Sequence, residues 1–226
     1  ILFGVVRDLG SAHDPNTRVP TVVAPLNVVP KKAGKLRLCH DGRPANKSIS
    51  PGVFKMETLG RMRYIWEPGG YLITADLNSA YWTLELAPSA ADLCGFCWRG
   101  RYLQWNALPF GISEACRIFQ KFQDALWRGL RTGRHALVPR PRMVAAPTAG
   151  TVGMTGSHAG IVGLTYIDDC AATASTPEEL RWMAAYLITV LIRCGWVISW
   201  RKCSLVPTQE GIVLGMRINL KRYRYE

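Results

Sequence analysis

Two adjacent aspartates, Asp168 and Asp169, lie inside the apolar and β-branched stretch Leu164–Ser175. Such a stretch is typical of a β-hairpin, and aspartate at its centre favours the turn. A carboxylate in buried surroundings is costly unless something positive pairs with it. This pair therefore constrains the fold strongly, because the hairpin must present both acids to a cation or to solvent.

A third acid, Asp76, follows the short apolar run Tyr71–Ala75. One strand end and one hairpin turn can bring three carboxylates together on a sheet, where they would repel one another or take up protons. Magnesium resolves that conflict, because it prefers carboxylate oxygens and completes its shell with water and substrate phosphates. Two such ions clamp the attacking and leaving oxygens of a phosphoryl displacement. The pattern indicates nucleotidyl transfer or phosphodiester hydrolysis, and an ordinary turn is the alternative for the aspartate pair alone.

The chain is strongly basic, with 28 Lys and Arg against 16 Asp and Glu in 226 residues, a net charge of +12. This excess favours a polyanionic partner, with nucleic acid ahead of an anionic membrane, although charge can also serve solubility alone. The seven cysteines form no disulfide framework, and Cys94 and Cys97 form a lone CxxC without a second pair at zinc-site spacing, which favours reduced cysteines over a metal site. No apolar run is long enough to span a bilayer. We therefore expect an intracellular protein, cytoplasmic or nuclear, with no signal peptide or transmembrane segment.

The order of the predicted elements indicates an α+β fold, because strands and helices do not alternate regularly. The clearest helix runs from Thr176 to Gly195, with Pro177 at its first position and Glu179 completing a capping box. A second helix is predicted from Ser113 to Gly133, with an apolar face that is formed by Ala115, Ile118, Phe119, Phe122 and Leu126. The other predicted elements are strands at Val22–Val29, Lys35–Cys39, Tyr71–Ala75, Val197–Trp200 and Ile212–Ile218, and hairpins at Gly95–Pro109 and Gly160–Ser175.

Residues 131–160 interrupt this pattern. Of these 30 residues, 18 are Gly, Pro, Ala, Ser or Thr, and none is acidic. Such a composition predicts a flexible, basic loop inserted into the fold.

Six stretches resemble the fingers and palm of reverse transcriptases of the retrotransposon kind, and they occur in that family's order. They are PKKAGKLRLCHDGRPAN (30–46), ADLNSAYW (75–82), LPFGISEACRIFQ (108–120), YIDD (166–169), SWRKCSL (199–205) and VLGMRI (213–218). Each motif alone is weak, whereas six in order are a strong signal. The LPFG sequence points toward gypsy-like or DIRS-like elements.

The resemblance implies a right-hand polymerase without a complete thumb, in which an antiparallel palm sheet is backed by helices and joined to a mixed fingers subdomain. It divides the chain into a lead-in (1–20), part of the fingers (21–70) and the palm (71–220), with fingers elements near 88–108. The inserted loop (131–160) lies within the palm, and residues 221–226 begin a truncated continuation.

The resemblance also implies the roles of individual residues. Asp76, Asp168 and Asp169 would be catalytic and would bind two Mg²⁺ ions, for which Mn²⁺ is a substitute, with the Leu77 carbonyl completing a coordination shell. The dNTP would be bound by Lys31, Lys32, Arg37, Asn78, Ser79, Ala80, Tyr81, Phe110, Gly111 and Lys202. Lys202 would lie near the leaving pyrophosphate, and Lys31 could replace Lys32 because the length of the turn is ambiguous. The primer-grip region would contain Leu214 and Gly215.

The implied activity is RNA-directed DNA polymerisation, in which dNTPs extend a DNA primer on an RNA or DNA template. Thumb, RNase H and integrase or recombinase parts would belong to a longer polyprotein. Two alternatives stay open: a decayed or domesticated copy that binds nucleic acid without catalysis, and an RNA-dependent RNA polymerase. The long segment between Phe119 and Tyr166 favours the first alternative. Tyr81 argues against the second, because its ring would collide with a ribose 2′-hydroxyl.

Overall fold

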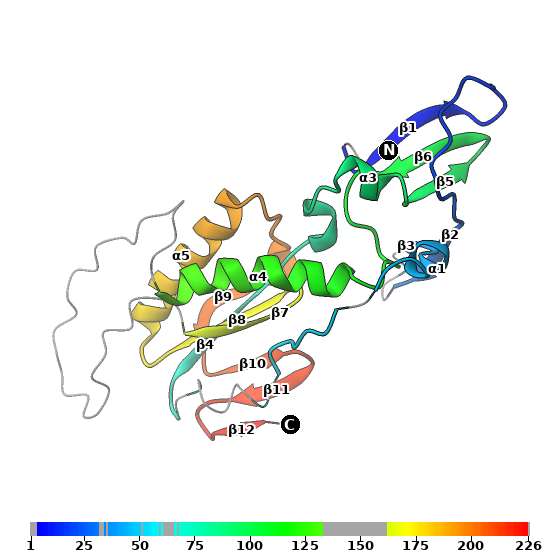
Figure 1. Cartoon of the computed structure of the whole chain (residues 1–226). Helices are drawn as coiled ribbons and strands as arrows, with labels where there is room; N and C mark the ends of the chain where they lie inside the picture. The colour runs from blue at the N-terminus through cyan, green and yellow to red at the C-terminus, as the bar shows by residue number, and fades with distance from the viewer. Residues whose placement is uncertain are drawn as a thin grey trace. The chain divides into compact units, whose positions relative to one another are not determined.

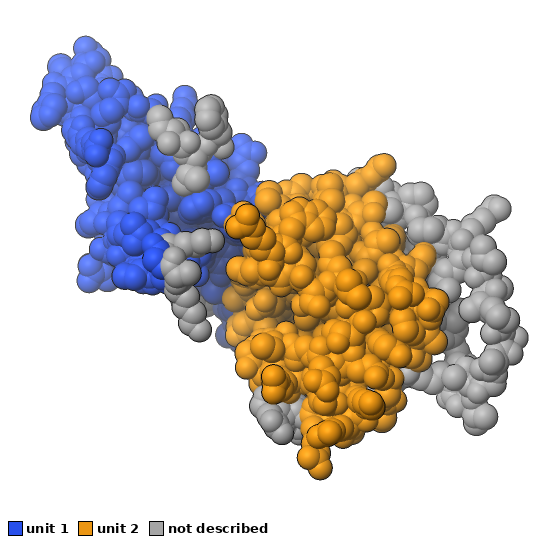
Figure 2. Space-filling view, turned by 180° about the vertical axis from the view of Figure 1, so that it is seen from behind, with its two compact units in different colours: residues 1–54, 79–119 blue, residues 55–78, 120–226 orange. Residues whose placement is uncertain are grey.

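The computed structural model of the chain describes residues 4–31, 34, 36–50, 52–58, 60, 66, 68–132 and 162–225. The chain forms two compact units, one of residues 1–54 and 79–119 and the other of residues 55–78 and 120–226 (Figure 2). Each unit is therefore assembled from two separate stretches of sequence. The subdomain boundaries that the resemblance implies stay a prediction.

The first unit contains two antiparallel sheets. Strands β1 (Val6–Ser11), β6 (Arg101–Trp105) and β5 (Gly95–Trp98) form one sheet in that order. The predicted β5–β6 turn is confirmed, since Arg99 and Gly100 both have positive φ, as a two-residue hairpin of the primed type requires. Strand β1 was not predicted, because residues 1–20 are polar and carry only weak strand signals.

The second sheet of this unit pairs β2 (Leu26–Pro30) with β3 (Leu36–His40). Both strands lie a few residues from their predicted positions at Val22–Val29 and Lys35–Cys39. The unit also contains short helical turns, α1 (Arg43–Asn46), η2 (Ala80–Thr83) and α3 (Pro88–Ala91). Its core includes Cys94, Phe96 and Trp105, with Trp82 stacked 6.0 Å from Trp105 between ring centroids.

The second unit is built on an antiparallel sheet of four strands in the order β7-β8-β4-β9 (Figure 1). These strands span Gly163–Tyr166 (β7), Asp169–Ala174 (β8), Tyr71–Asp76 (β4) and Ser204–Thr208 (β9). Helix α5 (Pro177–Arg193) packs against β8, β9 and β4. The predicted antiparallel sheet with helices beside it is thereby confirmed, and with it the α+β fold class.

Helix α5 begins as predicted, because the Thr176 hydroxyl accepts a hydrogen bond from the Glu179 amide and Pro177 occupies the first turn. It ends at Arg193, just before Gly195, whose φ of 83° stops the helix. The sequence also predicts an apolar stripe of Leu180, Met183, Leu187, Leu191 and Cys194 on this helix. The first four of these residues are buried, whereas Cys194 is only half-buried.

Helix α4 (Ala115–Thr132) begins two residues after the predicted start at Ser113. The Ser113 amide donates to the Asn46 side chain. The predicted buried position Phe122 is exposed, since the helix buries the face that contains Phe119, Gln123 and Leu126. Arg131 and Thr132 belong to α4, so the predicted loop cannot begin at residue 131. The rest of that predicted loop, residues 133–160, lies outside the described residues.

Two strand predictions near the C-terminal end are wrong. Val197–Trp200 is not a strand, since Ile198 forms only an isolated bridge with Leu77 and the chain then turns into the 3₁₀ helix η3 (Trp200–Lys202). The predicted single strand Ile212–Ile218 is a hairpin of β10 (Glu210–Val213) and β11 (Met216–Asn219), because Leu214 and Gly215 both adopt positive φ.

The hairpin β10–β11, extended by β12 (Arg224–Tyr225), covers one face of the four-stranded sheet. Its Val213 and Ile218 share a buried cluster with Leu72 and Leu164 of the larger sheet. No helix in the described part of the chain combines the length and apolar character that a bilayer crossing requires.

Candidate active site

The three predicted acids lie at adjoining positions of the four-stranded sheet. Strands β4 and β8 are neighbours, and their register places Asp76 directly opposite Asp169. Asp168 occupies the turn between β7 and β8, and its carbonyl accepts a hydrogen bond from the Leu77 amide at 2.9 Å. One strand end and one hairpin turn therefore bring these acids together, as the sequence predicted.

The carboxylates differ in their surroundings. Asp76 is buried, with 8% of its surface exposed, whereas Asp168 and Asp169 are half-buried. Burial, and next the charges of Asp168 and Asp76, raise the pKa of Asp169 to about 6. The site thus holds more negative charge than its surroundings compensate.

Lys202 supplies the positive charge at this position. Its Nζ lies 2.9 Å from each carboxylate oxygen of Asp76, and this hydrogen bonding is the largest cause that raises the pKa of Lys202. The backbone at η3 also docks on the end of β4, because the Ser199 amide donates to the Asp76 carbonyl. The Cys203 thiol accepts a hydrogen bond from the Asp76 amide at 3.3 Å. Sequence reasoning assigned a role to Lys202 but none to Ser199 and Cys203, although both belong to the same SWRKCSL stretch.

The donor chemistry of these residues fits a hard divalent cation. Carboxylates are the preferred ligands of Mg²⁺, and Asp76 already holds the cationic Lys202 with both oxygens. The raised pKa of Asp169 is the shift that a nearby cation would reverse. In the described ranges, however, no three His, Cys, Asp or Glu side chains already surround one point as the ligands of a metal would.

Several predicted nucleotide-binding residues gather within the first unit. The Arg37 guanidinium lies 4.9 Å from the centroid of the Phe110 ring, and the Phe110 ring lies 4.9 Å from that of Tyr81. The Tyr81 hydroxyl is 2.8 Å from the Cys116 thiol, and only 6% of Tyr81 is exposed. Tyr81 is thus buried, whereas its neighbour Trp82 is half-buried.

The remaining predicted residues are placed as follows. Ser79 has a left-handed backbone and Ala80 is buried, both in the first unit, while the Asn78 amide in the second unit donates to the Val197 carbonyl. Lys31 is exposed at the end of β2, and Lys32 lies outside the described residues.

Gly111 is required for packing within the first unit. Its φ is 117°, and a Cβ there would lie 1.9 Å from the His40 carbonyl oxygen. The Asn46 side chain donates to the Gly111 carbonyl at 2.9 Å and accepts from the Ser113 amide. The carboxylate of Asp41 binds the Arg43 guanidinium. These contacts give residues 41–46 (DGRPAN) a structural role, because they tie the β2–β3 hairpin to the LPFG segment.

Leu214 and Gly215 line a cavity of about 530 Å³ together with Tyr166 and Asp169. The β10–β11 turn that they form is therefore adjacent to the acidic hairpin within the second unit. Thr58 and Ile212 complete the described lining. The structure thus brings the predicted primer-grip residues to the predicted catalytic hairpin.

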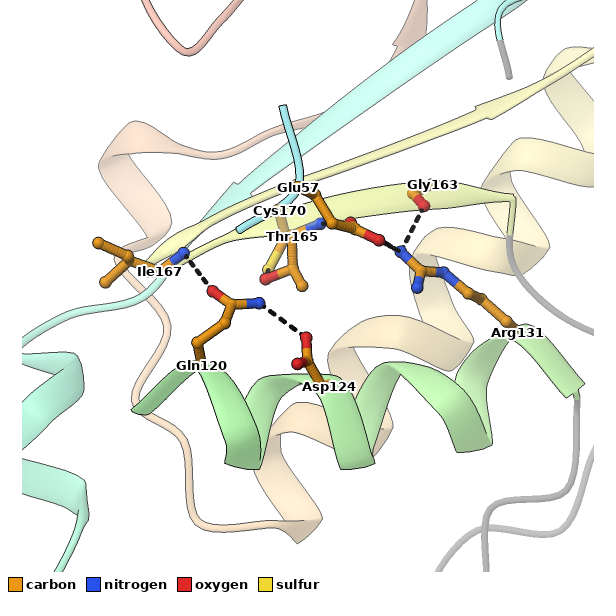
Figure 3. A network of polar contacts seen from close by, with 8 residues as sticks. All are labelled: Glu57, Gln120, Asp124, Arg131, Gly163, Thr165, Ile167 and Cys170. Atoms are coloured by element: carbon orange, nitrogen blue, oxygen red, sulfur yellow. Dashed lines mark hydrogen bonds and ion pairs between the residues drawn. The ribbon is translucent and has the colours of Figure 1, made fainter. Parts of the chain in front are cut away.

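A network of polar side chains supports the hairpin from the side of α4 (Figure 3). Glu57 accepts a hydrogen bond from the Thr165 amide at 2.9 Å and pairs with Arg131, which also donates to the Gly163 carbonyl. Gln120 contacts the amide of Ile167 in the turn. Sequence reasoning missed this network, because its members are far apart in the chain.

A model of the family described as reverse transcriptase (RNA-dependent DNA polymerase) matches residues 29–218. The chain is 25% identical over 199 residues to the Pro-Pol polyprotein of Simian foamy virus type 1, an alignment that covers 88% of this chain and 14% of that protein. It is 31% identical over 191 residues to the Enzymatic polyprotein of Cestrum yellow leaf curling virus, covering 83% of this chain and 25% of the other. The chain thus spans a quarter or less of the length of these relatives.

Solved structures with a similar fold include foamy viral protease–reverse transcriptases. One in complex with double-stranded DNA has a TM-score of 0.72 at 20% identity, covering 96% of this chain and 31% of that one. Another, in complex with an RNA/DNA hybrid, has a TM-score of 0.70 at 18% identity, covering 96% of this chain and 24% of the other. At these identities the likeness shows the fold, and the predicted polymerase architecture is confirmed.

Proposed function

Because the chain belongs to the reverse transcriptase (RNA-dependent DNA polymerase) family, we propose that it catalyses the template-directed addition of dNTPs to a DNA primer. The observation that carries this proposal is the register of β4 and β8, which sets Asp76 opposite Asp169 with Asp168 at the adjoining turn. Acids that serve only as turn residues would not need this alignment on a buried sheet.

Reverse transcriptases use divalent metal ions. Asp76, Asp168 and Asp169 would hold two Mg²⁺ ions, or Mn²⁺ in their place, and the Leu77 carbonyl would add one oxygen. When bound, such ions stabilise the charge on the attacking and leaving oxygens of nucleotidyl transfer. Lys202 neutralises Asp76 in the free protein. Because 64% of its side chain is exposed, its ammonium can also offer charge or a proton to the leaving pyrophosphate.

Several residues of the first unit would bind the nucleotide. Arg37 and one of Lys31 or Lys32 would hold the triphosphate, because charge-assisted hydrogen bonds suit phosphate oxygens. The Arg37 guanidinium over the Phe110 ring, and the tilted contact of Phe110 with Tyr81, support a common position of these residues beside the incoming sugar and base. The other members of the proposed set are Asn78, Ser79, Ala80, Gly111 and Lys202.

Nucleic acid would be the main partner, as an RNA or DNA template with a DNA primer. The net charge of +12 supports a polyanionic ligand. The cavity beside Leu214, Gly215 and Asp169 would receive the primer end. All seven cysteines are free, which suits a reducing compartment, cytoplasmic or nuclear.

Primer extension by the full-length protein tests this proposal, with RNA and DNA templates and with dNTPs and rNTPs in parallel. We expect Mg²⁺-dependent dNTP addition on the RNA template, and no extension by Asp76→Asn. Extension with rNTPs alone would identify an RNA polymerase. Binding of primer–template without any extension would identify a non-catalytic nucleic-acid-binding protein.

A further inference from the structure

Ile167, in the turn between β7 and β8, has an unusual backbone. Its φ is 53°, in the left-handed region, whereas Asp168 beside it is not among the residues with positive φ. Glycine is the usual residue where only the first position of a two-residue hairpin turn has positive φ. A β-branched side chain is a rare outlier there, and such a conformation persists only where its surroundings enforce it.

Two glutamines of helix α4 contact both polar groups of this backbone. The Gln123 Nε2 donates to the Ile167 carbonyl at 2.9 Å, and the Gln120 Oε1 accepts from the Ile167 amide at 3.4 Å. The two glutamines are three residues apart and therefore share one face of the helix. Both are buried, with 2% of Gln120 and none of Gln123 exposed.

Asp124 determines how the Gln120 amide is turned. Its Oδ1 accepts a hydrogen bond from the Gln120 Nε2 at 2.8 Å, which leaves the Gln120 Oε1 to face Ile167 (Figure 3). The helix thus presents an acceptor to the Ile167 amide and a donor to the Ile167 carbonyl.

Burial of the Gln123 side-chain amide costs free energy that an apolar side chain would not. Its Oε1 is buried and has no hydrogen-bond partner in the described part of the chain. A buried polar atom without a partner costs free energy, so the amide must gain from the bond that its nitrogen makes. Retention of the amide is therefore better explained by the bond that it donates to Ile167.

The turn also connects directly to the acids. Asp168 follows Ile167, and its carbonyl accepts from the amide of Leu77, the residue after Asp76. The helix fixes one side of the turn and β4 fixes the other. A change of the Ile167 backbone would therefore redirect the carboxylates of Asp168 and Asp169 relative to Asp76.

We propose that Gln120 and Gln123 are positioning residues that hold Ile167 in the left-handed conformation and thereby orient the acidic hairpin for divalent cations. This inference rests on the proposed function where activity is the readout. Both glutamines act on the hairpin through the Ile167 backbone.

The first test compares Gln120→Met and Gln123→Met in the full-length protein. We expect the Mg²⁺ concentration for half-maximal extension to rise about tenfold in Gln123→Met, with the Kd for primer–template changed less than twofold. Amide exchange in residues 164–170 should be faster in both variants, and Mn²⁺ binding measured by electron paramagnetic resonance should weaken. Gln104→Met is the matched control, because Gln104 is also buried with an unpartnered Oε1 but lies in β6 of the first unit.

The second test repeats Gln123→Met in an Ile167→Gly background. Glycine adopts positive φ without strain, so the hairpin then depends less on the glutamine. The loss of Mn²⁺ affinity caused by Gln123→Met should be at least threefold smaller in that background. An equal loss in both backgrounds, or a fall in thermal stability with an unchanged Mn²⁺ affinity and exchange rate, would overturn the inference. If the wild type does not extend primers, the proposed function fails, while amide exchange still decides whether the glutamines hold the turn.

Discussion

Glu57 is expected to contribute strongly to stability, because it satisfies backbone groups at the edge of the four-stranded sheet. Strand β7 lies at that edge, so no described strand pairs with the Thr165 amide and the Gly163 carbonyl on their outer side. The Glu57 carboxylate accepts a hydrogen bond from the Thr165 amide at 2.9 Å. Arg131, which pairs with Glu57, donates to the Gly163 carbonyl at 3.0 Å. Together they replace the hydrogen bonds of a missing strand (Figure 3).

The cost of Glu57→Ala follows from these contacts. It leaves the amide of the fully buried Thr165 without its acceptor, which costs about 1–3 kcal/mol. The pair with Arg131 adds at most about 1 kcal/mol, because 38% of the arginine side chain is exposed. A total near 2–3 kcal/mol corresponds to a fall of roughly 4–12 °C in the unfolding midpoint for a chain of this size.

Calorimetric unfolding of wild type, Glu57→Ala and Glu178→Ala measures this effect. Glu178 is the matched control, because it also pairs with an arginine, Arg181, but both side chains are largely exposed. Its loss should cost less than about 1 kcal/mol. Equal destabilisation by the two substitutions would refute the argument that Glu57 satisfies a buried strand edge.

Tyr81→Val should raise the use of rNTPs relative to dNTPs in single-nucleotide extension, because the ring would collide with a 2′-hydroxyl; an unchanged ratio of kcat/KM removes Tyr81 from the sugar site. Arg37→Gln should raise the apparent KM for dNTP, whereas weaker primer–template binding with a flatter salt dependence would place Arg37 on the nucleic-acid backbone. Burial lowers the pKa of His40, and Asp41 opposes this only in part. The unfolded chain therefore takes up a proton at His40 that the folded chain resists as the pH falls through about 6.5, so the contribution of His40 to the free energy of unfolding should fall from pH 7.5 to pH 5.5. The raised pKa of Asp169 acts in the opposite direction over this range, so the comparison with a His40 variant isolates the effect. His40→Leu should reduce this fall, and the same change at the exposed His13 should not.

The elements that could be predicted from the sequence are those with local chemical signals. Thr176 and Pro177 mark a helix start, and Arg99–Gly100 marks a hairpin, because cap and turn chemistry depends on adjacent residues. Strand β1 escaped prediction, because its sequence is polar and its pairing with β6 is distant in the chain. The β10–β11 turn carried a signal in Gly215, but the apolar residues around it concealed the reversal.

The acids of the candidate site were predictable for a similar reason. An aspartate in an apolar run is unusual wherever it occurs, so Asp76, Asp168 and Asp169 stand out without a structure. Gln123 did not stand out, because a glutamine on a helix is usually solvated. It does share a helical face with Phe119 and Leu126, and that placement of an amide on an apolar stripe was the available signal.

The central claim is that the acids of this sheet perform nucleotidyl transfer. Asp168→Asn tests it most directly, since the change removes one carboxylate while keeping the size of the side chain. The measurement is single-turnover primer extension with Mg²⁺, alongside the Kd for the same primer–template. We predict a Kd close to that of wild type and no detectable extension. Extension by Asp168→Asn at a rate near that of wild type would contradict the claim.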